Sequence, residues 1–131
     1  MTVVVDASAL VSYLLASDRE HGWTSSVLAD EAWACPELAL AEASNILRRM
    51  ELTGDLSRPD VTAAYAELLQ FEIDLHPFAP YAVRIWELRN NLTIYDAWYV
   101  ALAEALNCPL VTLDRRLSRA QGPTCAILSP H

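Results

Sequence analysis

Three aspartates stand at points in the sequence where carboxylates can meet. Asp6 follows a short apolar, β-branched run, Asp96 precedes a long run of helix formers, and Asp114 follows a second apolar run. In α/β folds the carboxyl ends of strands and the amino ends of helices lie along the edge of the sheet where ligands bind. Each aspartate is also a good helix N-cap. Taken one at a time, these residues leave both roles open.

Glu42 is a fourth acid in an unusual place. On the helix expected over 37–52, Leu38, Glu42 and Ile46 share one face, so the carboxylate lies on an apolar stripe. Neither Asn45 nor Ile46, its neighbours one turn on, is basic. A carboxylate on a core-facing stripe costs free energy unless a charged group meets it. The alternative is that Glu42 points outward between two apolar neighbours.

Four carboxylates that lie close together would need a bound cation to balance their charge. Their mutual repulsion would be severe without one. An all-oxygen set with no histidine or cysteine favours Mg²⁺ or Mn²⁺ over zinc, and the three histidines of the chain are scattered without ligand spacing. Hard divalent ions held by carboxylates activate water for phosphoryl chemistry. This chemistry is therefore the one that the acidic set predicts.

Residue types that the sequence lacks exclude several classes of protein that carry out phosphoryl chemistry. There are three glycines, and none belongs to a P-loop or a dinucleotide-binding motif, so NTPase and dinucleotide-binding functions are excluded. All nine basic residues are arginine. Two-component receiver domains and phosphatases of the haloacid-dehalogenase type use a lysine beside the phosphoryl group, so both are disfavoured. A metal-dependent nuclease, which needs only acids, water and metal, remains.

Alternating strand and helix patterns must position these acids. The apolar and alternating runs predict strands at 3–5, 33–35, 71–76, 110–113 and 125–128. Helical patterns begin near residues 7 and 57 and span 21–32, 37–52, 81–90 and 97–106. Such alternation favours an α/β fold with a parallel or mostly parallel sheet covered by helices. A length of 131 residues fits one domain.

Composition sets further bounds. The net charge of −8 gives no long-range attraction to nucleic acid, so RNA binding would need metal ions and a local arginine patch. The three cysteines are odd in number and lack C-x-x-C spacing, as expected for buried thiols in a reducing compartment. The N-terminus has no basic segment, and Asp6 interrupts its apolar run. We therefore expect no signal peptide or membrane span, and a cytoplasmic protein.

Four motifs together resemble a known family. They are VVVDASAL, LALAEASNIL, LTIYDAWYVALAEAL and PLVTLDRRL, and each contains one of the four acids. In this order and spacing they resemble the PIN-domain nucleases, and more narrowly the VapC toxins of bacterial toxin–antitoxin pairs. The resemblance runs from Val3 to Leu117 and then to the last strand.

The resemblance implies a fold, a reaction and partners. It implies a single PIN domain over 1–131, built as a three-layer α/β/α sandwich with a central, mostly parallel sheet. It implies that Asp6, Glu42, Asp96 and Asp114 are the catalytic residues and bind Mg²⁺ or Mn²⁺, with endoribonuclease activity that leaves 5′-phosphate and 3′-hydroxyl ends. It further implies a homodimer and a small antitoxin protein, one segment of which fills the nuclease groove.

Three polar residues near the acids are expected to support them. Ser8 matches a hydroxyl position of the family, where it would bind a ligand carboxylate or a metal-bound water, or else cap a helix. Thr112 is expected to orient Asp114, unless it is an ordinary strand threonine. Asn45 faces the groove or lies on the surface.

Arginines beside the motifs are the candidates for RNA contact. Arg115 and Arg116 follow Asp114 directly and are expected to contact substrate phosphate, or else to be the solvated start of a helix. Arg48 and Arg49 line the groove or lie exposed.

Two other functions and one surface remain open at this stage. A PIN nuclease for RNA maturation would have no antitoxin, and a PIN-like binding module would have no catalysis. Apolar and aromatic residues in excess of a small core suggest a dimer surface, although core packing is the expected role of each one alone. These residues are Tyr13, Trp33, Trp86 and Trp98.

Overall fold

The computed structural model describes residues 1–130 and contains one five-stranded sheet in which every pair of neighbours is parallel. The order of the strands is β3-β2-β1-β4-β5. Their bounds are β1 (Thr2–Val5), β2 (Ala32–Pro36), β3 (Ile73–His76), β4 (Leu110–Val111) and β5 (Ile127–Leu128). The parallel sheet predicted from the sequence is confirmed.

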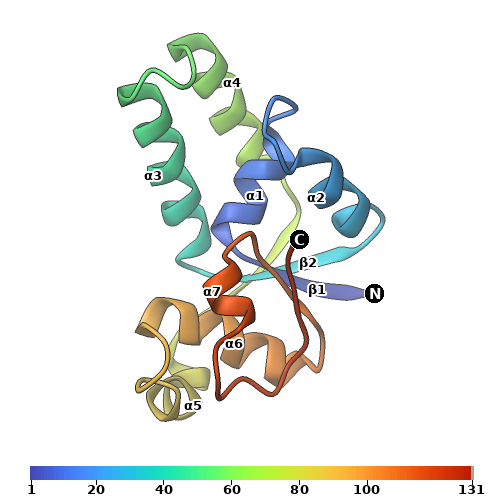
Figure 1. Cartoon of the computed structure of the whole chain (residues 1–131), viewed down its shortest axis with the longest axis vertical. Coiled ribbons are helices and arrows are strands. Elements are labelled where there is room, and N and C mark those ends of the chain that lie inside the picture. Colours follow the sequence, from blue (N-terminus) through green and yellow to red (C-terminus); the bar gives the residue numbers. More distant parts are fainter. Residues whose placement is uncertain (131) are drawn as a thin grey trace.

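Helices cover both faces of this sheet. They are α1 (Ala7–Leu14), α2 (His21–Leu28), α3 (Ala39–Leu52), α4 (Arg58–Leu68), α5 (Ala82–Glu87), α6 (Ile94–Leu106) and α7 (Arg115–Ser118), with a 3₁₀ turn, η1 (Ala79–Tyr81), before α5. Figure 1 shows α1 to α4 on one side of the sheet and α5 and α6 on the other. The three-layer α/β/α sandwich is thus as expected.

The chain reverses its direction across the sheet at β1. It first runs outward from β1 to β2 and β3, and then returns through α5 and α6 to β4 on the other side of β1. In open α/β sheets the connections that leave two such strands diverge and open a crevice at their carboxyl ends, where ligands bind. The residues that follow Val5 and Val111 therefore stand at the place where a site is expected.

The core is centred on β1, β4 and α6. The side chains of Val4, Val5, Leu110 and Val111 are fully buried, as the apolar, β-branched runs predict for inner parallel strands. Small residues of α6, including Ala97 and its neighbours one turn on, let the helix pack closely against β1 and β2. Because the middle of α6, from Tyr99 to Ala103, is buried, the helix is a rigid support for the side chains of its first turn.

Several predicted boundaries were wrong. The helix expected over 21–32 ends at Leu28, because Asp30 adopts a left-handed backbone (φ 65°) and Ala32 already pairs with Thr2 in the sheet. The strand expected over 71–76 begins at Ile73. Phe71 instead packs edge-on against other rings, with centroid distances of 5.0 Å to Trp33 and 5.7 Å to Tyr13.

The later elements are shorter than expected or begin elsewhere. The helix over 81–90 is α5 with η1 before it, and the last strand is confined to Ile127–Leu128. The strand expected over 110–113 ends at Val111, because Thr112 and Leu113 lead into the cap of α7. In contrast, α6 begins three residues earlier than predicted, at Ile94.

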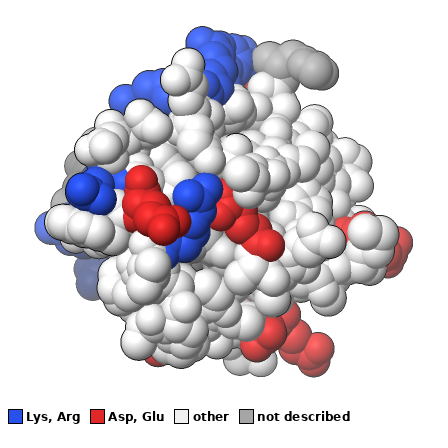
Figure 2. Space-filling model, turned by 90° about the horizontal axis from the view of Figure 1, so that it is seen from below, with Lys and Arg blue, Asp and Glu red and all other residues white. Residues whose placement is uncertain are grey.

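Large apolar side chains are exposed on α5 and just before it. Figure 2, seen from below, shows acidic and basic groups side by side near the middle of one face of the molecule, with a broad uncharged area around them. Val83 is 78 % exposed and Trp86 is 61 % exposed; one turn apart, they form the outer side of α5. Phe78, in the segment before η1, is 40 % exposed. By contrast, Tyr13, Trp33 and Trp98 pack against the core.

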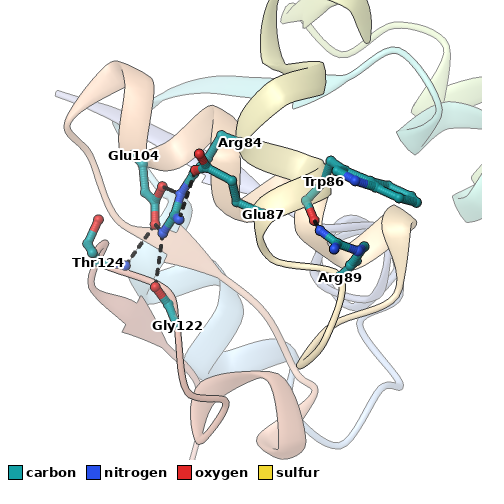
Figure 3. Close-up of polar contacts among 7 residues, drawn as sticks. All are labelled: Arg84, Trp86, Glu87, Arg89, Glu104, Gly122 and Thr124. Carbon is teal, nitrogen blue, oxygen red and sulfur yellow. Dashed lines mark hydrogen bonds and ion pairs between the residues drawn. The ribbon is translucent and has the colours of Figure 1, made fainter.

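A polar cluster fixes α5 to α6 and to the following chain (Figure 3). The Arg84 guanidinium donates to both carboxylate oxygens of Glu104, at 2.7 and 3.0 Å, and to the carbonyl of Gly122 at 3.0 Å. Glu104 also accepts a hydrogen bond from the backbone N–H of Thr124 at 2.8 Å. Burial alone would raise the pKa of Glu104, but these hydrogen bonds lower it overall. Arg89 lies over the ring of Trp86, 4.4 Å from its centroid.

No helix within residues 1–130 is both long enough and apolar enough to cross a membrane.

Candidate active site

All four predicted acids line one cavity at the carboxyl ends of β1 and β4. The cavity has a volume of about 240 Å³. Its lining residues are Asp6, Ala7, Ser8, Glu42, Asn45, Ile46, Arg49, Asp96, Tyr99 and Asp114. The acids come from four separate segments of the chain, and the crossover of the sheet at β1 brings them together.

Asp6 is the most deeply buried of the four, with 8 % of its surface exposed. It caps α1, because its Oδ1 accepts the backbone N–H of Ala9 at 3.0 Å. The Ser8 hydroxyl donates to the same oxygen at 2.6 Å, and the Thr112 hydroxyl donates to Oδ2. Burial nevertheless raises the pKa of Asp6 to about 6, despite these three donors. Asp6 is thus both a helix cap and part of the cavity wall.

The two hydroxyls also join Asp6 to the segment that carries Asp114. Ser8 Oγ accepts the backbone N–H of Leu113 at 3.1 Å, and Thr112 Oγ1 accepts that of Asp114 at 3.0 Å. Ser8 is therefore not the cap of α1. Thr112 contacts the backbone of Asp114, as a residue that orients it would, but its own proton is directed to Asp6.

Asp96 lies on the first turn of α6, although it is not the cap expected from the sequence. Thr93 caps the helix, and its side chain accepts the backbone N–H of Asp96 at 3.1 Å. The carboxylate is half-buried. Burial raises its pKa, and the negative charge of Asp114 raises it further. Since capping is done by Thr93, the side chain of Asp96 is left to face the cavity.

Asp114 caps the short helix α7. Its Oδ1 accepts the backbone N–H groups of Arg116 and Leu117 at 2.9 and 3.4 Å. The Nε atom of Arg116 lies 3.6 Å from the same oxygen, but its side chain is 93 % exposed, and such a surface pair contributes little to stability. Arg115, also exposed, is the first residue of α7. Both arginines therefore begin a helix, and Arg116 stays beside the acids.

Within residues 1–130 Glu42 has a neutral hydrogen-bond partner. The hydroxyl of Tyr99, from α6, donates to Glu42 Oε1 at 2.6 Å. Burial raises the pKa of Glu42, and the negative charge of Asp96 raises it further. The phenol is itself buried next to a carboxylate, which raises the pKa of Tyr99 far above its ordinary value. Sequence reasoning missed Tyr99; its only local signal is its place one turn after Asp96.

The remaining polar residues lie in three hollows. Asn45 and Arg49, on α3, line the cavity of the acids, whereas Arg48 lines a groove between α3 and α4. The third hollow, of about 290 Å³, lies next to the cavity of the acids and contains Asp96, Asp114 and Arg116. Because Asp96 and Asp114 line both, the two hollows adjoin, with Arg49 in one and Arg116 in the other.

Comparison with known proteins identifies the family. The model of the PIN domain matches residues 3–123. Ribonuclease VapC9 of Mycobacterium tuberculosis (strain ATCC 25618 / H37Rv) is 40 % identical over 125 residues, which are 95 % of each chain. The chain belongs to the PIN-domain family. Within the family its relatives are the VapC ribonucleases, which confirms the prediction from the four motifs and places the chain among RNA-cleaving hydrolases.

Solved PIN-domain structures share the fold. VapC20 of M. tuberculosis, described as a Sarcin-Ricin loop cleaving toxin, superimposes with a TM-score of 0.68 at 19 % identity, over 88 % of this chain and 92 % of that one. VapBC2 of Rickettsia felis, bound to a DNA fragment from its promoter, gives a TM-score of 0.67 at 16 % identity over 98 % of each chain. At these identities the likeness establishes the three-layer fold.

The donor set of this PIN domain suits a hard divalent cation. Three of its four carboxylates have raised pKa values, and in all three a neighbouring acid is among the causes that follow burial. No basic side chain within residues 1–130 forms an ion pair with Asp6, Glu42 or Asp96. In that described part no three acids stand close enough to form a finished metal-binding group. A cation would therefore draw together side chains that now only share a cavity.

Proposed function

We propose that this PIN domain, residues 1–131, is a Mg²⁺- or Mn²⁺-dependent endoribonuclease that acts in the cytoplasm as the toxin of a toxin–antitoxin pair. The observation that supports it is the meeting of four acids from distant segments in one cavity at the crossover of the sheet. In this proposal Asp6, Glu42, Asp96 and Asp114 hold the metal. The bound metal supplies an activated water and stabilises the leaving oxygen.

The residues of the chain have distinct parts in the reaction. Asp6 is held from three sides, by Ala9, Ser8 and Thr112, so its carboxylate is the fixed point of the site. Asp96 and Asp114 lie where the two hollows join, so the phosphodiester to be cut is held there. Their charges favour the metal-bound state over the free one, because the cation offsets their repulsion.

In this proposal the two adjoining hollows offer a path for a single RNA strand. Arg49 lies in the hollow on one side of Asp96 and Asp114, and Arg116 lies in the hollow on the other side. Arginine binds phosphate through two parallel N–H groups. We propose that these two residues contact the phosphates that flank the scissile one, with Arg115 beside them and Asn45 on the wall. With a net charge of −8, RNA affinity depends on these local contacts.

An antitoxin is the proposed protein partner. Solved structures with this fold include VapBC2 of R. felis and a chain described as a toxin–antitoxin complex from Klebsiella pneumoniae. The acidic cavity has an excess of negative charge, so a partner segment with basic side chains would complement it and exclude RNA. In this proposal the bound segment keeps the nuclease inactive until the antitoxin is removed.

A homodimer is proposed through the outer side of α5. Val83, Trp86 and Phe78 are large apolar side chains that are exposed on α5 and in the segment before it. Exposed apolar surface of this kind marks interfaces. Trp86, with Arg89 stacked on its ring, has the character of an interface anchor.

The decisive experiment removes one charge from the site. Asp96→Asn is expected to lower RNA cleavage by at least 100-fold, and EDTA is expected to abolish cleavage by the unaltered protein. Asp60→Asn is the matched control, because Asp60 is also the third residue of a helix and also follows a capping side chain, that of Ser57, but lies outside the cavity. Cleavage by the Asp96→Asn protein at the unaltered rate, with the same metal, would refute the proposal.

A further inference from the structure

Glu42 depends on a single neighbour for its position. Within residues 1–130 the only hydrogen bond to its carboxylate comes from the Tyr99 hydroxyl, at 2.6 Å, and no ion pair reaches it. Arg49 lines the same cavity but is exposed. A glutamate has three side-chain torsions, so without this contact its carboxylate would sample several positions.

Asp6 and Asp114 are held differently from Glu42. Asp6 accepts a backbone N–H and two hydroxyls, and Asp114 accepts two backbone N–H groups of its own helix. These donors are fixed by the fold of the segment itself or of the adjoining strand. Glu42 is instead held by a residue 57 positions away, on a helix of the opposite layer. Unlike Asp6 and Asp114, Glu42 therefore depends on a single side chain for its placement.

Tyr99 is well built for this task. Its residue is 3 % exposed, and the neighbouring positions Ala97, Val100 and Ala101 are almost completely buried. A buried ring with two torsions holds its hydroxyl rigidly. Tyr99 also lies one turn after Asp96, so both project from the same side of α6. The helix that carries one acid therefore also fixes the position of another.

We propose that Tyr99 is a positioning residue that holds Glu42 Oε1 and leaves Oε2, which accepts no hydrogen bond from residues 1–130, to bind the metal ion. This inference rests on the proposed function, in which the acids hold the metal. Removing the hydroxyl frees the Glu42 carboxylate to move but leaves all four acids in the chain. The expected result is weaker metal binding with an unchanged fold, because partners of metal ligands typically contribute 10- to 100-fold in affinity.

The test is Mn²⁺ binding measured by calorimetry with the full chain. Tyr99→Phe removes only the hydroxyl and is expected to weaken Mn²⁺ binding about tenfold. Tyr95→Phe is the control: Tyr95 is on the same helix, is 59 % exposed, and its hydroxyl makes no hydrogen bond within residues 1–130. It is expected to bind as the unaltered protein does. Equal Mn²⁺ affinity in Tyr99→Phe and in the unaltered protein would overturn the inference.

A double-variant cycle separates positioning from a general loss of structure. On a Glu42→Ala background the Tyr99 hydroxyl has nothing to position, so Tyr99→Phe is expected to have no further effect on Mn²⁺ affinity. A further tenfold loss there would show that Tyr99 acts elsewhere, and would overturn the inference. Failure of the proposed function has a different signature, since the unaltered protein would then bind no Mn²⁺ at all.

Discussion

Replacement of Asp6 by asparagine should change the stability of the protein in opposite ways with and without metal. Burial raises the pKa of Asp6 from 3.8 to about 6. A rise of about two pH units, at about 1.4 kcal/mol per unit, means that the ionised carboxylate lowers the free energy of unfolding by about 3 kcal/mol at neutral pH. Asparagine removes the charge and remains a good N-cap.

The expected gain is smaller than this upper bound. The asparagine amide has to pair with Ser8 or Thr112 in place of a carboxylate oxygen, so we expect about 1 to 2 kcal/mol of stabilisation in EDTA at pH 7.5. For a chain of this size each kcal/mol is about 3 to 4 °C in melting temperature. The Asp6→Asn protein should therefore melt about 3 to 8 °C above the unaltered one.

The pH dependence has a definite sign. Below pH 3.8 Asp6 is protonated in both the folded and the unfolded protein, so it imposes no cost. As the pH rises towards 6, the unfolded chain releases its proton first, so stability falls, and the full cost is present above the folded pKa of about 6. In EDTA the advantage of Asp6→Asn should therefore grow between about pH 4 and pH 6 and then stay constant.

Metal should reverse this order. At a Mg²⁺ concentration a hundred times its dissociation constant, the unaltered protein gains about 2.7 kcal/mol, which exceeds the gain of about 1 to 2 kcal/mol from the substitution in EDTA, whereas a protein without the Asp6 carboxylate binds the ion more weakly and gains less. The assay is thermal unfolding followed by circular dichroism, in EDTA and in MgCl₂, with Asp60→Asn as a control for the loss of an exposed acid. The reasoning is refuted if Asp6→Asn melts below the unaltered protein in EDTA.

Two further predictions concern the surface and the polar cluster of α5. Arg84→Ala leaves Glu104 without its bidentate partner and should lower the melting temperature by about 3 to 8 °C, or about 1 to 2 kcal/mol after allowance for the partial exposure of Arg84. Because the pKa of Glu104 is lowered in the folded protein, this loss should be seen at neutral pH and should disappear as the pH falls well below 4.5; a loss that persists in acid would contradict it. Trp86→Glu should convert a homodimer to a monomer, as measured by light scattering, without changing the melting temperature of the monomer. A molecular mass equal to that of the unaltered dimer would place the dimer contact elsewhere.

The sheet and the meeting of the acids were accessible from the sequence because both depend on strong local patterns. The run Val3–Val5 is short, apolar and β-branched, which is typical of an inner parallel strand, and the residue after it necessarily lies at the edge of the sheet. The apolar stripe around Glu42 likewise indicated which side of its helix faces the core. These patterns do not depend on exact boundaries.

The errors arose where one residue had two good local roles. Thr93 and Asp96 form a T-x-x-D capping pattern, but Asp96 is itself a good cap, so the start of α6 was placed too late. Asp30 adopts a left-handed backbone, which an aspartate adopts far less often than a glycine, and nothing nearby marked the end of α2. Both decisions depend on tertiary contacts that local propensity does not contain.

Tyr99 and Arg84 were missed for a different reason. Each has its partner on another element, 57 positions away for Glu42 and 20 for Glu104. No periodicity connects such pairs, and a tyrosine in a helix rich in alanine and leucine is most simply explained as part of the core. Contacts of this type become visible only when the helices are placed in space.

The long-range hydrogen bonds of Asp6 and Ser8 have a consequence for when the protein can act. Thr112 and Leu113, 106 and 105 positions away from their partners, close the site only after the last inner strand has docked beside β1. A nascent chain, or a fragment cut anywhere between these segments, therefore has acids but no assembled site. Catalytic competence requires β4 to be docked beside β1, and local opening at β4 would be enough to remove it.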